Sequence, residues 1–232
     1  MNSIKINNMV VYSPDSSNNL IDYVINKKKI LIAINAEKIL NANKKLKKII
    51  NNNIGYPDGF GAVLAMRKKG LIQSKKIPGC ELWLEFVNKF YMKKSFYIIG
   101  STNTVINKTV TKLKKQFKGI NILNYRDGYI KSNKEKDTLC NDVSILKPDI
   151  VLVAMGTPCQ EYFMCELHSK HKATYIGLGG SFDIYVGNLN RAPSFFIEKN
   201  LEWLYRLFKE PKRITRQIRL IKFIILLYLN KL

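Results

Sequence analysis

The chain has 232 residues, 46% of them hydrophobic, and its 39 Lys and Arg against 17 Asp and Glu give a formal charge of +22. This length accommodates one substantial core and leaves little chain for a second domain. The charge favours an anionic partner such as nucleic acid, anionic lipid or a phosphorylated substrate. No window holds the ~18–20 apolar residues that a spanning helix needs, so we expect no transmembrane segment.

The first segment, residues 1–19, is polar and contains no apolar stretch typical of an export signal. The four cysteines form no CxxC pair, and a chain of this size does not need disulfides for stability. We therefore expect a cytoplasmic protein in a reducing compartment.

Four short apolar runs, each followed by a polar turn, are typical of buried strands. They are Ile30–Ile34, Phe96–Ile99, Asp149–Met155 and Ala173–Leu178. Helical patterns lie between them, over residues 82–91 and 104–117. This alternation predicts an α/β fold with a mostly parallel, Rossmann-like sheet covered by helices on both faces. Ligands bind such sheets at the carboxyl ends of the strands, where the polar turns fall.

The turn Tyr56-Pro57-Asp58-Gly59 carries a carboxylate bounded by Pro and Gly. A reaction in which a hydroxyl attacks needs a base to remove its proton, and Asp58 could serve. The alternative is that Asp58 caps the apolar helical run that follows it.

The turn Gly156-Thr157-Pro158-Cys159-Gln160-Glu161 follows the third apolar run. Gln160 and Glu161 offer directional hydrogen bonds that suit sugar hydroxyls or a uracil edge. Alternatively, Pro158 only starts a helix and Glu161 complements the helix dipole.

The glycine-rich turn over residues 177–183, GLGGSFD, follows the fourth apolar run. Such a turn exposes backbone N–H groups at a helix N-terminus, which suits a phosphate or a diphosphate. The alternative is a tight strand-to-helix crossover without a ligand. Nearby, Cys165, His168 and His171 lie around a helix rather than along one face, so we expect an ordinary helix surface and no metal site.

The pattern of apolar and basic residues changes near Ser194. Apolar residues then recur at helical spacing on both sides of Pro211, and the last helical stretch is basic on its opposite face, at Arg213, Arg216, Arg219 and Lys222. We predict two parts: an α/β catalytic domain over residues 1–195 and a basic, amphipathic helical appendage over residues 196–232. The appendage suits the surface of an anionic membrane. Docking on the core of the protein or on a second subunit is the alternative.

Together these segments resemble the WecG/TagA/CpsF family, glycosyltransferase family 26, from about residue 30 to residue 216. The matching motifs, in chain order, are Asn35-Ala36-Glu37, Pro57-Asp58-Gly59, Pro78-Gly79, Gly100-Ser101, Gly156-x-Pro158-x-Gln160-Glu161, the GLGGSFD turn, Arg191-Ala192-Pro193 and Leu201-Glu202-Trp203-Leu204-Tyr205-Arg206-Leu207.

The resemblance implies an inverting glycosyltransferase that needs neither a metal nor another cofactor. Its donor would be a UDP-sugar, with UDP-N-acetylmannosamine, its uronate and UDP-glucose as candidates, and its acceptor an undecaprenyl-diphosphate-linked sugar used for surface polysaccharide. Lys76 and Glu81 stand where family members often carry Arg and Asp, which leaves the donor sugar open.

The resemblance also implies roles for individual residues. Asp58 corresponds to the proposed general base, and Asn35 to a polar residue in the same pocket. Arg206, Arg213 and Arg216 correspond to appendage arginines that hold the diphosphate, a role that suits guanidinium groups. The implied substrate-binding residues are Lys76, Gly100, Ser101, Gly156, Gln160, Glu161, Gly179, Gly180, Asp183 and Arg191.

The expected partners are therefore the UDP-sugar, the lipid-linked acceptor and the anionic inner surface of the cell membrane, where the protein would be peripheral. The resemblance also allows a homo-oligomer.

One rival interpretation is a non-catalytic basic protein that binds nucleic acid or membrane. The aromatic residues are not interleaved with basic ones as in nucleic-acid motifs, so we expect no nucleic acid. A nucleotide-cofactor oxidoreductase is disfavoured because no GxGxxG follows the first apolar run.

Overall fold

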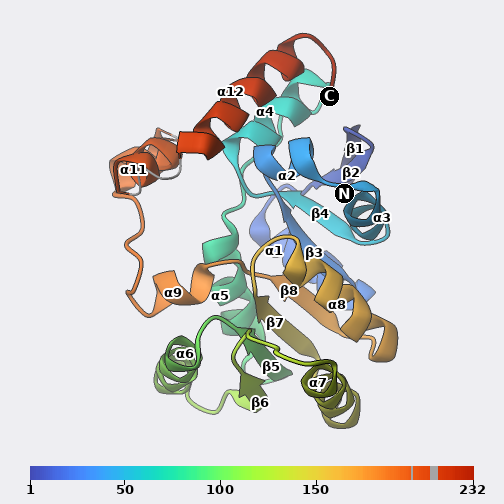
Figure 1. The fold of residues 1–232 in the computed structure, drawn as a ribbon, viewed down its shortest axis with the longest axis vertical. Helices are drawn as coiled ribbons and strands as arrows, with labels where there is room; N and C mark the ends of the chain where they lie inside the picture. The colour runs from blue at the N-terminus through green and yellow to red at the C-terminus, as the bar shows by residue number, and fades with distance from the viewer. Residues whose placement is uncertain (200, 210–213) are drawn as a thin grey trace.

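A computed structural model describes residues 1–199, 201–209 and 214–232. Within these residues, six strands form one sheet in the order β4-β3-β8-β7-β5-β6 (Figure 1). All neighbouring strands are parallel, so the predicted α/β fold is confirmed. The strands are β3 (Ile30–Ile34), β4 (Ile54–Pro57), β5 (Ser95–Gly100), β6 (Asn121–Arg126), β7 (Ile150–Ala154) and β8 (Thr174–Gly177).

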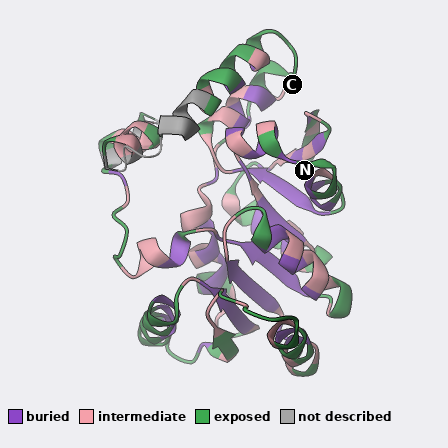
Figure 2. Ribbon diagram, in the orientation of Figure 1, coloured by how far each residue is buried: buried purple, intermediate pink, exposed green. Residues whose placement is uncertain are grey.

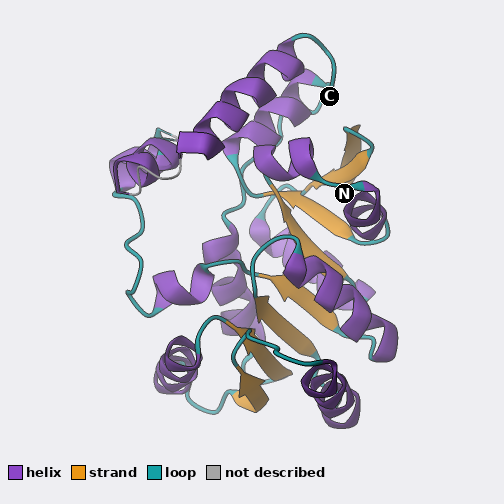
Figure 3. Cartoon of the chain, viewed as in Figure 1, coloured by secondary structure: helices purple, strands orange, loops and turns teal. Residues whose placement is uncertain are grey.

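Helices cover both faces of the sheet (Figure 3). One core contains side chains from α2 (Ala36–Asn41), α3 (Lys44–Asn51), α4 (Phe60–Lys68), α7 (Asn133–Leu146) and α8 (Cys159–Lys170). The other contains side chains from α1 (Ser17–Lys27), α5 (Gly79–Phe90), α6 (Asn103–Gln116) and α9 (Ser181–Tyr185). Strands β3, β5, β7 and β8 lie between the two cores and are largely buried on both faces, which explains their continuous apolar runs (Figure 2).

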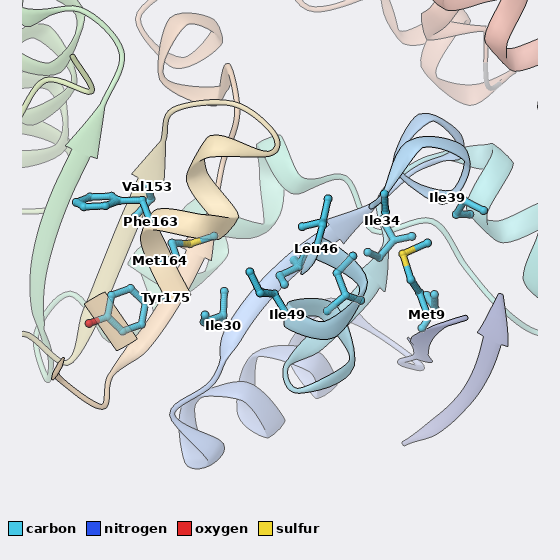
Figure 4. Packing of buried hydrophobic residues seen from close by; sticks show 14 of the residues in the cluster. Met9, Ile30, Ile34, Ile39, Leu46, Ile49, Val153, Phe163, Met164 and Tyr175 are labelled. Carbon is cyan, nitrogen blue, oxygen red and sulfur yellow. The ribbon is translucent and has the colours of Figure 1, made fainter. Parts of the chain in front are cut away.

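The first core brings together residues that are far apart in the chain (Figure 4). Met9 comes from a small antiparallel hairpin of β1 (Asn2–Ile6) and β2 (Met9–Ser13). Ile30 and Ile34 come from β3, and Phe163 and Met164 from α8. The hairpin therefore belongs to the same hydrophobic core as the large sheet.

The helices that follow β5 and β7 lie on opposite faces of the sheet. Val105 and Val110 of α6 belong to one core, whereas Phe163 and Leu167 of α8 belong to the other. Chains that leave neighbouring strands in opposite directions open a crevice at the carboxyl ends of those strands. The topology therefore places a ligand crevice beside the ends of β5 and β7.

The C-terminal helices are α10 (Ser194–Glu198), α11 (Glu202–Lys209) and α12 (Ile214–Tyr228). Phe223 and Leu227 of α12 are buried in the core that contains α2 and α4, and α12 lies alongside α4 in Figure 1. Lys68 of α4 donates to the carbonyl oxygens of Leu227 and Tyr228, at 2.8 and 2.9 Å. The alternative that the last helix docks on the protein's own core is thus confirmed for the side of α12 that carries Phe223 and Leu227. The domain boundary at residue 195 stays a prediction.

None of the helices within the described ranges is long and apolar enough to cross a bilayer.

Candidate active site

The polar turns predicted from the sequence lie side by side along the carboxyl edge of the sheet. The strand register pairs Ile34 with Pro57, so Asn35 and Asp58 leave neighbouring strands at the same level. It also pairs Gly100 with Ala154, and Val153 with Gly177. Five turns, after β4, β3, β8, β7 and β5, therefore form one row.

Asp58 is held between two elements. Its backbone N–H donates to the Ile34 carbonyl at 3.0 Å, and its Oδ1 accepts the N–H of Gly79, the first residue of α5, at 2.6 Å. A helix N-terminus stabilises an ionised carboxylate. The helix after Asp58, α4, has Gly59 as its N-cap with no side-chain hydrogen bond, so the alternative that Asp58 caps this helix is wrong.

Gly79 permits this contact because it has no side chain. A Cβ at this position would lie 2.8 Å from the Tyr56 hydroxyl and 3.2 Å from Asp58 Oδ1. Next along α5, burial raises the pKa of the Cys80 thiol, the Arg191 guanidinium opposes this rise, and the Asp58 carboxylate adds to it. Cys80 therefore stays a thiol at neutral pH and is a poor nucleophile.

Asn35 caps α2. Its side-chain oxygen accepts the Lys38 N–H at 2.9 Å, and its Cβ lies 3.4 Å from the position of a Cβ on Gly59. The structure therefore places Asn35 against the Asp58 turn and fixes the orientation of Asn35 through α2. The role in a substrate pocket that the family resemblance implies for Asn35 stays a prediction.

Ser101 and Asp183 connect the turns after β5 and β8. Ser101 Oγ donates to Asp183 Oδ2 at 2.9 Å, and Ser101 adopts a left-handed backbone conformation with φ 54°. Gly100 before it has φ +139°, and a Cβ there would lie 2.3 Å from the Ala154 carbonyl oxygen. Only glycine fits this position without a shift of β7.

Gln160 and Glu161 point inward from the start of α8. Their exposed fractions are 4% and 0%. Gln160 Oε1 accepts the Gly179 N–H at 2.9 Å, and Glu161 Oε1 lies 2.7 Å from the Lys38 ammonium. As placed, the two side chains hold neighbouring turns together, and their predicted contact with a donor stays a prediction.

The glycines of these turns need backbone conformations that other residues avoid. Gly156 and Gly179 have φ +76° and +55°, with open space where a Cβ would stand. Gly180 caps the short helix α9, and Ser181 Oγ donates back to the Leu178 carbonyl at 2.7 Å. The structure thus contains the tight crossover, and the predicted phosphate contact of these glycines stays a prediction.

The predicted cations at the site edge are paired with carboxylates. Lys76 Nζ lies 2.7 Å from Glu202 Oε2, which belongs to α11. Arg191 pairs with Glu81 of α5. Both pairs join segments near α5 to the C-terminal part of the chain.

The three predicted appendage arginines are not placed by the structure. Arg213 lies outside the described residues. Arg206 belongs to α11 and Arg216 to α12, but their side chains are not described. Their roles stay predictions.

His168 of α8 and His171, the C-cap of this helix, have structural partners. The ring Nε2 of His168 lies 2.7 Å from the Lys28 carbonyl, and that of His171 lies 2.8 Å from the Pro148 carbonyl. In the described part of the chain, no group of three or more His, Cys, Asp or Glu side chains could hold a metal ion.

Lys38 connects two of these turns although no sequence pattern singles it out. Its side chain is 4% exposed and joins the turn after β3 to the turn after β7. One lysine among 39 basic residues carries no signal of its own, and its partner lies 123 positions away in the chain.

The chain matches the sequence model of the Glycosyl transferase WecG/TagA/CpsF family over residues 4–232. It is also similar to an N-acetylglucosaminyldiphosphoundecaprenol N-acetyl-beta-D-mannosaminyltransferase of Bacillus spizizenii, with 38% identity over 170 residues. The matched region covers 72% of this chain and 65% of the relative, so the chain spans just under two thirds of the relative's length.

Proposed function

The chain belongs to the WecG/TagA/CpsF glycosyltransferase family, and from this premise we propose that it transfers a sugar from a UDP-sugar to an undecaprenyl-diphosphate-linked sugar. The observation that carries the proposal is the Asp58 carboxylate, held by the Gly79 N–H at the carboxyl edge of the sheet beside Asn35. A carboxylate in this place is suited to accept a proton from a substrate hydroxyl.

The proposed reaction is a single displacement. Asp58 takes the proton of the acceptor hydroxyl while the hydroxyl oxygen attacks the anomeric carbon of the donor. The bond between that carbon and the diphosphate oxygen breaks on the opposite side, UDP leaves, and the configuration inverts. The negative charge that develops on the diphosphate needs nearby cations, for which Lys76 and the appendage arginines Arg206, Arg213 and Arg216 are our candidates.

The first donor to test is UDP-N-acetylmannosamine, with lipid-diphosphate-linked N-acetylglucosamine as acceptor. The Bacillus spizizenii relative is named for these two sugars, and that similarity supports the choice. UDP-glucose and the uronate of N-acetylmannosamine remain alternative donors.

We also propose that the protein is peripheral on the anionic inner face of the cell membrane. The support is an apolar strip that faces away from the core. It consists of Ile221, Ile224, Ile225 and Tyr228 of α12 and Leu229 directly after the helix. The net charge of +22 would favour anionic headgroups. A second copy of the chain could cover the same strip, so the homo-oligomer remains the competing occupant.

The test is UDP release by the full chain from a panel of UDP-sugars, with and without short-chain lipid-diphosphate-linked N-acetylglucosamine. Acceptor-dependent release from one donor would support the transferase and identify its donor. The absence of release with every combination, from protein that is folded by circular dichroism, would count against the proposed substrates.

A further inference from the structure

A buried ion pair lies directly behind the row of turns. Lys38 Nζ and Glu161 Oε1 are 2.7 Å apart, and their side chains are 4% and 0% exposed. Taking two charges out of water is costly, and a buried pair of this kind is weak evidence for stability, because apolar side chains of similar size often stabilise a fold equally well. A contribution to stability alone therefore does not explain why this position holds an ion pair.

The Lys38 end of the pair fixes the turn after β3. Lys38 Nζ also donates to the Ala33 carbonyl at 2.8 Å, and the Lys38 backbone N–H donates to the side chain of Asn35 at 2.9 Å. The same residue thus holds both the last part of the strand and the asparagine that lies against the Asp58 turn.

The Glu161 end fixes two further turns. Glu161 Oε1 accepts from Thr157 Oγ1 at 2.9 Å and from Gln160 Nε2 at 3.2 Å. The other atom of the Gln160 amide, Oε1, accepts the Gly179 N–H at 2.9 Å. One chain of contacts therefore runs from the turn after β3 through the turn after β7 to the turn after β8.

The network depends on Lys38 for its charge balance. Glu161 Oε2 is buried and has no hydrogen-bond partner among the described residues, so the interactions of this carboxylate converge on Oε1. Without Lys38, the Glu161 charge would be buried with only neutral donors around it.

We propose that Lys38 and Glu161 are positioning residues, which hold the turns after β3, β7 and β8 in register so that together they form the donor side of the site. Both side chains are buried, and in this role they act through Asn35, Thr157 and Gln160. The inference rests on the proposed function for its effect on turnover, but the geometry it describes can be tested without substrate.

The test separates positioning from stability with three variants. Lys38→Met leaves the Glu161 charge unpaired, Glu161→Gln leaves the Lys38 charge unpaired, and the double variant replaces the ion pair by neutral groups of similar size. We expect both single variants to lower the melting temperature and the double variant to recover most of that loss. Leu113→Ala, at a buried position of α6, provides a matched loss of stability away from the network.

The first measurement is amide hydrogen exchange in the absence of substrate. In the double variant we expect exchange of the Gly179 N–H to become at least ten-fold faster, with the amides of β5 and β7 unchanged, because local opening reports the loss of a local constraint. Unchanged exchange at Gly179 in the double variant would overturn the proposal, whatever the enzyme's substrates are.

The second measurement is steady-state UDP release. For the double variant we expect KM for the donor to rise at least ten-fold at a temperature where the protein is fully folded, whereas Leu113→Ala keeps the parent KM. A double variant with parent KM and kcat would overturn the proposal. A parent protein without activity would count against the proposed function alone and leave the exchange result to decide.

Discussion

At the scale of single residues, the placement of Asp58 depends on a neighbour that has no side chain. Gly79 brings a backbone N–H to within 2.6 Å of the carboxylate, at the first turn of α5. A larger residue would push against both Asp58 and the Tyr56 hydroxyl. The Asp58 carboxylate is therefore oriented by a backbone N–H group.

Asp58→Asn tests the base. The amide retains an oxygen that can accept the Gly79 N–H, so we expect the melting temperature and the affinity for UDP to stay close to those of the parent. We expect kcat to fall by about 10²–10⁴, the usual contribution of a positioned base. Asp22→Asn, which breaks a surface pair with Lys89, is the control and should leave kcat unchanged. Loss of UDP binding in Asp58→Asn would instead assign Asp58 to the donor.

Gly100 and Gly70 form a matched pair of glycines with positive φ, +139° and +106°. Alanine at Gly70 meets open space, so we expect only backbone strain of about 1–3 kcal/mol. Alanine at Gly100 would also collide with the Ala154 carbonyl, at 2.3 Å, which adds about 1–3 kcal/mol of overpacking. Urea unfolding measures both, and equal losses would show that β7 can move away at no cost.

At the scale of elements, His168 connects α8 to the turn between α1 and β3. The neutral ring fits its surroundings, because Nε2–H can donate to the Lys28 carbonyl while Nδ1 faces the Lys172 ammonium at 3.4 Å. Burial lowers the pKa of His168 from its usual value near 6.5, the Lys28 carbonyl opposes this, and the charges of Lys172 and Lys29 lower it further.

A pH titration tests this contact. The folded state binds a proton at His168 less readily than the unfolded state, so the stabilisation is complete above about pH 6.5 and is lost as pH falls through the lowered folded pKa. We expect the free energy of unfolding to fall less between about pH 7 and pH 5 in His168→Gln, which keeps an N–H donor but does not titrate. Parallel pH curves for parent and variant would contradict this assignment.

The strands that the sequence predicts are those whose burial on both faces produces a continuous apolar run. β3, β5, β7 and β8 are buried on both faces and therefore read as apolar runs. The four-residue strand β4 was missed because it contains Gly55 and Pro57, and Gly55 is needed where the Val10 carbonyl comes within 3.0 Å of a Cβ position. The edge strand β6, NILNYR, is polar and largely exposed, so it has no apolar run to find.

The same distinction applies to the candidate site. Asn35 and Ser101 could be predicted to lie in one row because each follows a recognisable strand. Asp58 follows β4, which has no apolar run, so only the family resemblance links it to Asn35. The Lys38–Glu161 pair could not be predicted, because it depends on which helices face each other across the edge of the sheet. Pairings between distant segments are decided by packing, which no local pattern records.

At the scale of the whole molecule, α12 has two apolar edges with different roles. Phe223 and Leu227 are buried against α2 and α4, whereas Ile225 and, directly after the helix, Leu229 are more than half exposed, at 54% and 58%. A helix used only for packing would bury its apolar residues along one seam. The outer edge is the part of the chain that we propose meets the membrane.

Vesicle binding tests the outer edge. We expect Ile225→Ser with Leu229→Ser to weaken binding to vesicles that contain anionic lipid by at least ten-fold. Burial of each methylene contributes about 0.8 kcal/mol, so the loss of only about two buried methylenes already gives this factor. The melting temperature in solution should be unchanged. Ile145→Ser, at an exposed position of α7, is the matched control and should bind like the parent. Equal binding by all variants would direct attention to a second copy of the chain as the partner of this edge.

The ion pair between Lys76 and Glu202 would also oppose donor binding, because Lys76 would have to leave Glu202 before it could bind the donor. If Lys76 holds the donor diphosphate as proposed, the diphosphate has to displace a carboxylate that is tethered to the same chain and sits 2.7 Å away. Glu202 then acts as an internal competitor, and Glu202→Gln should lower the Kd for UDP several-fold in a calorimetric titration. A bilayer that moves α11 away from Lys76 would free Lys76 and so increase the affinity for the donor. Because linkage between two binding equilibria is reciprocal, the bound donor would increase the affinity for the membrane by the same factor.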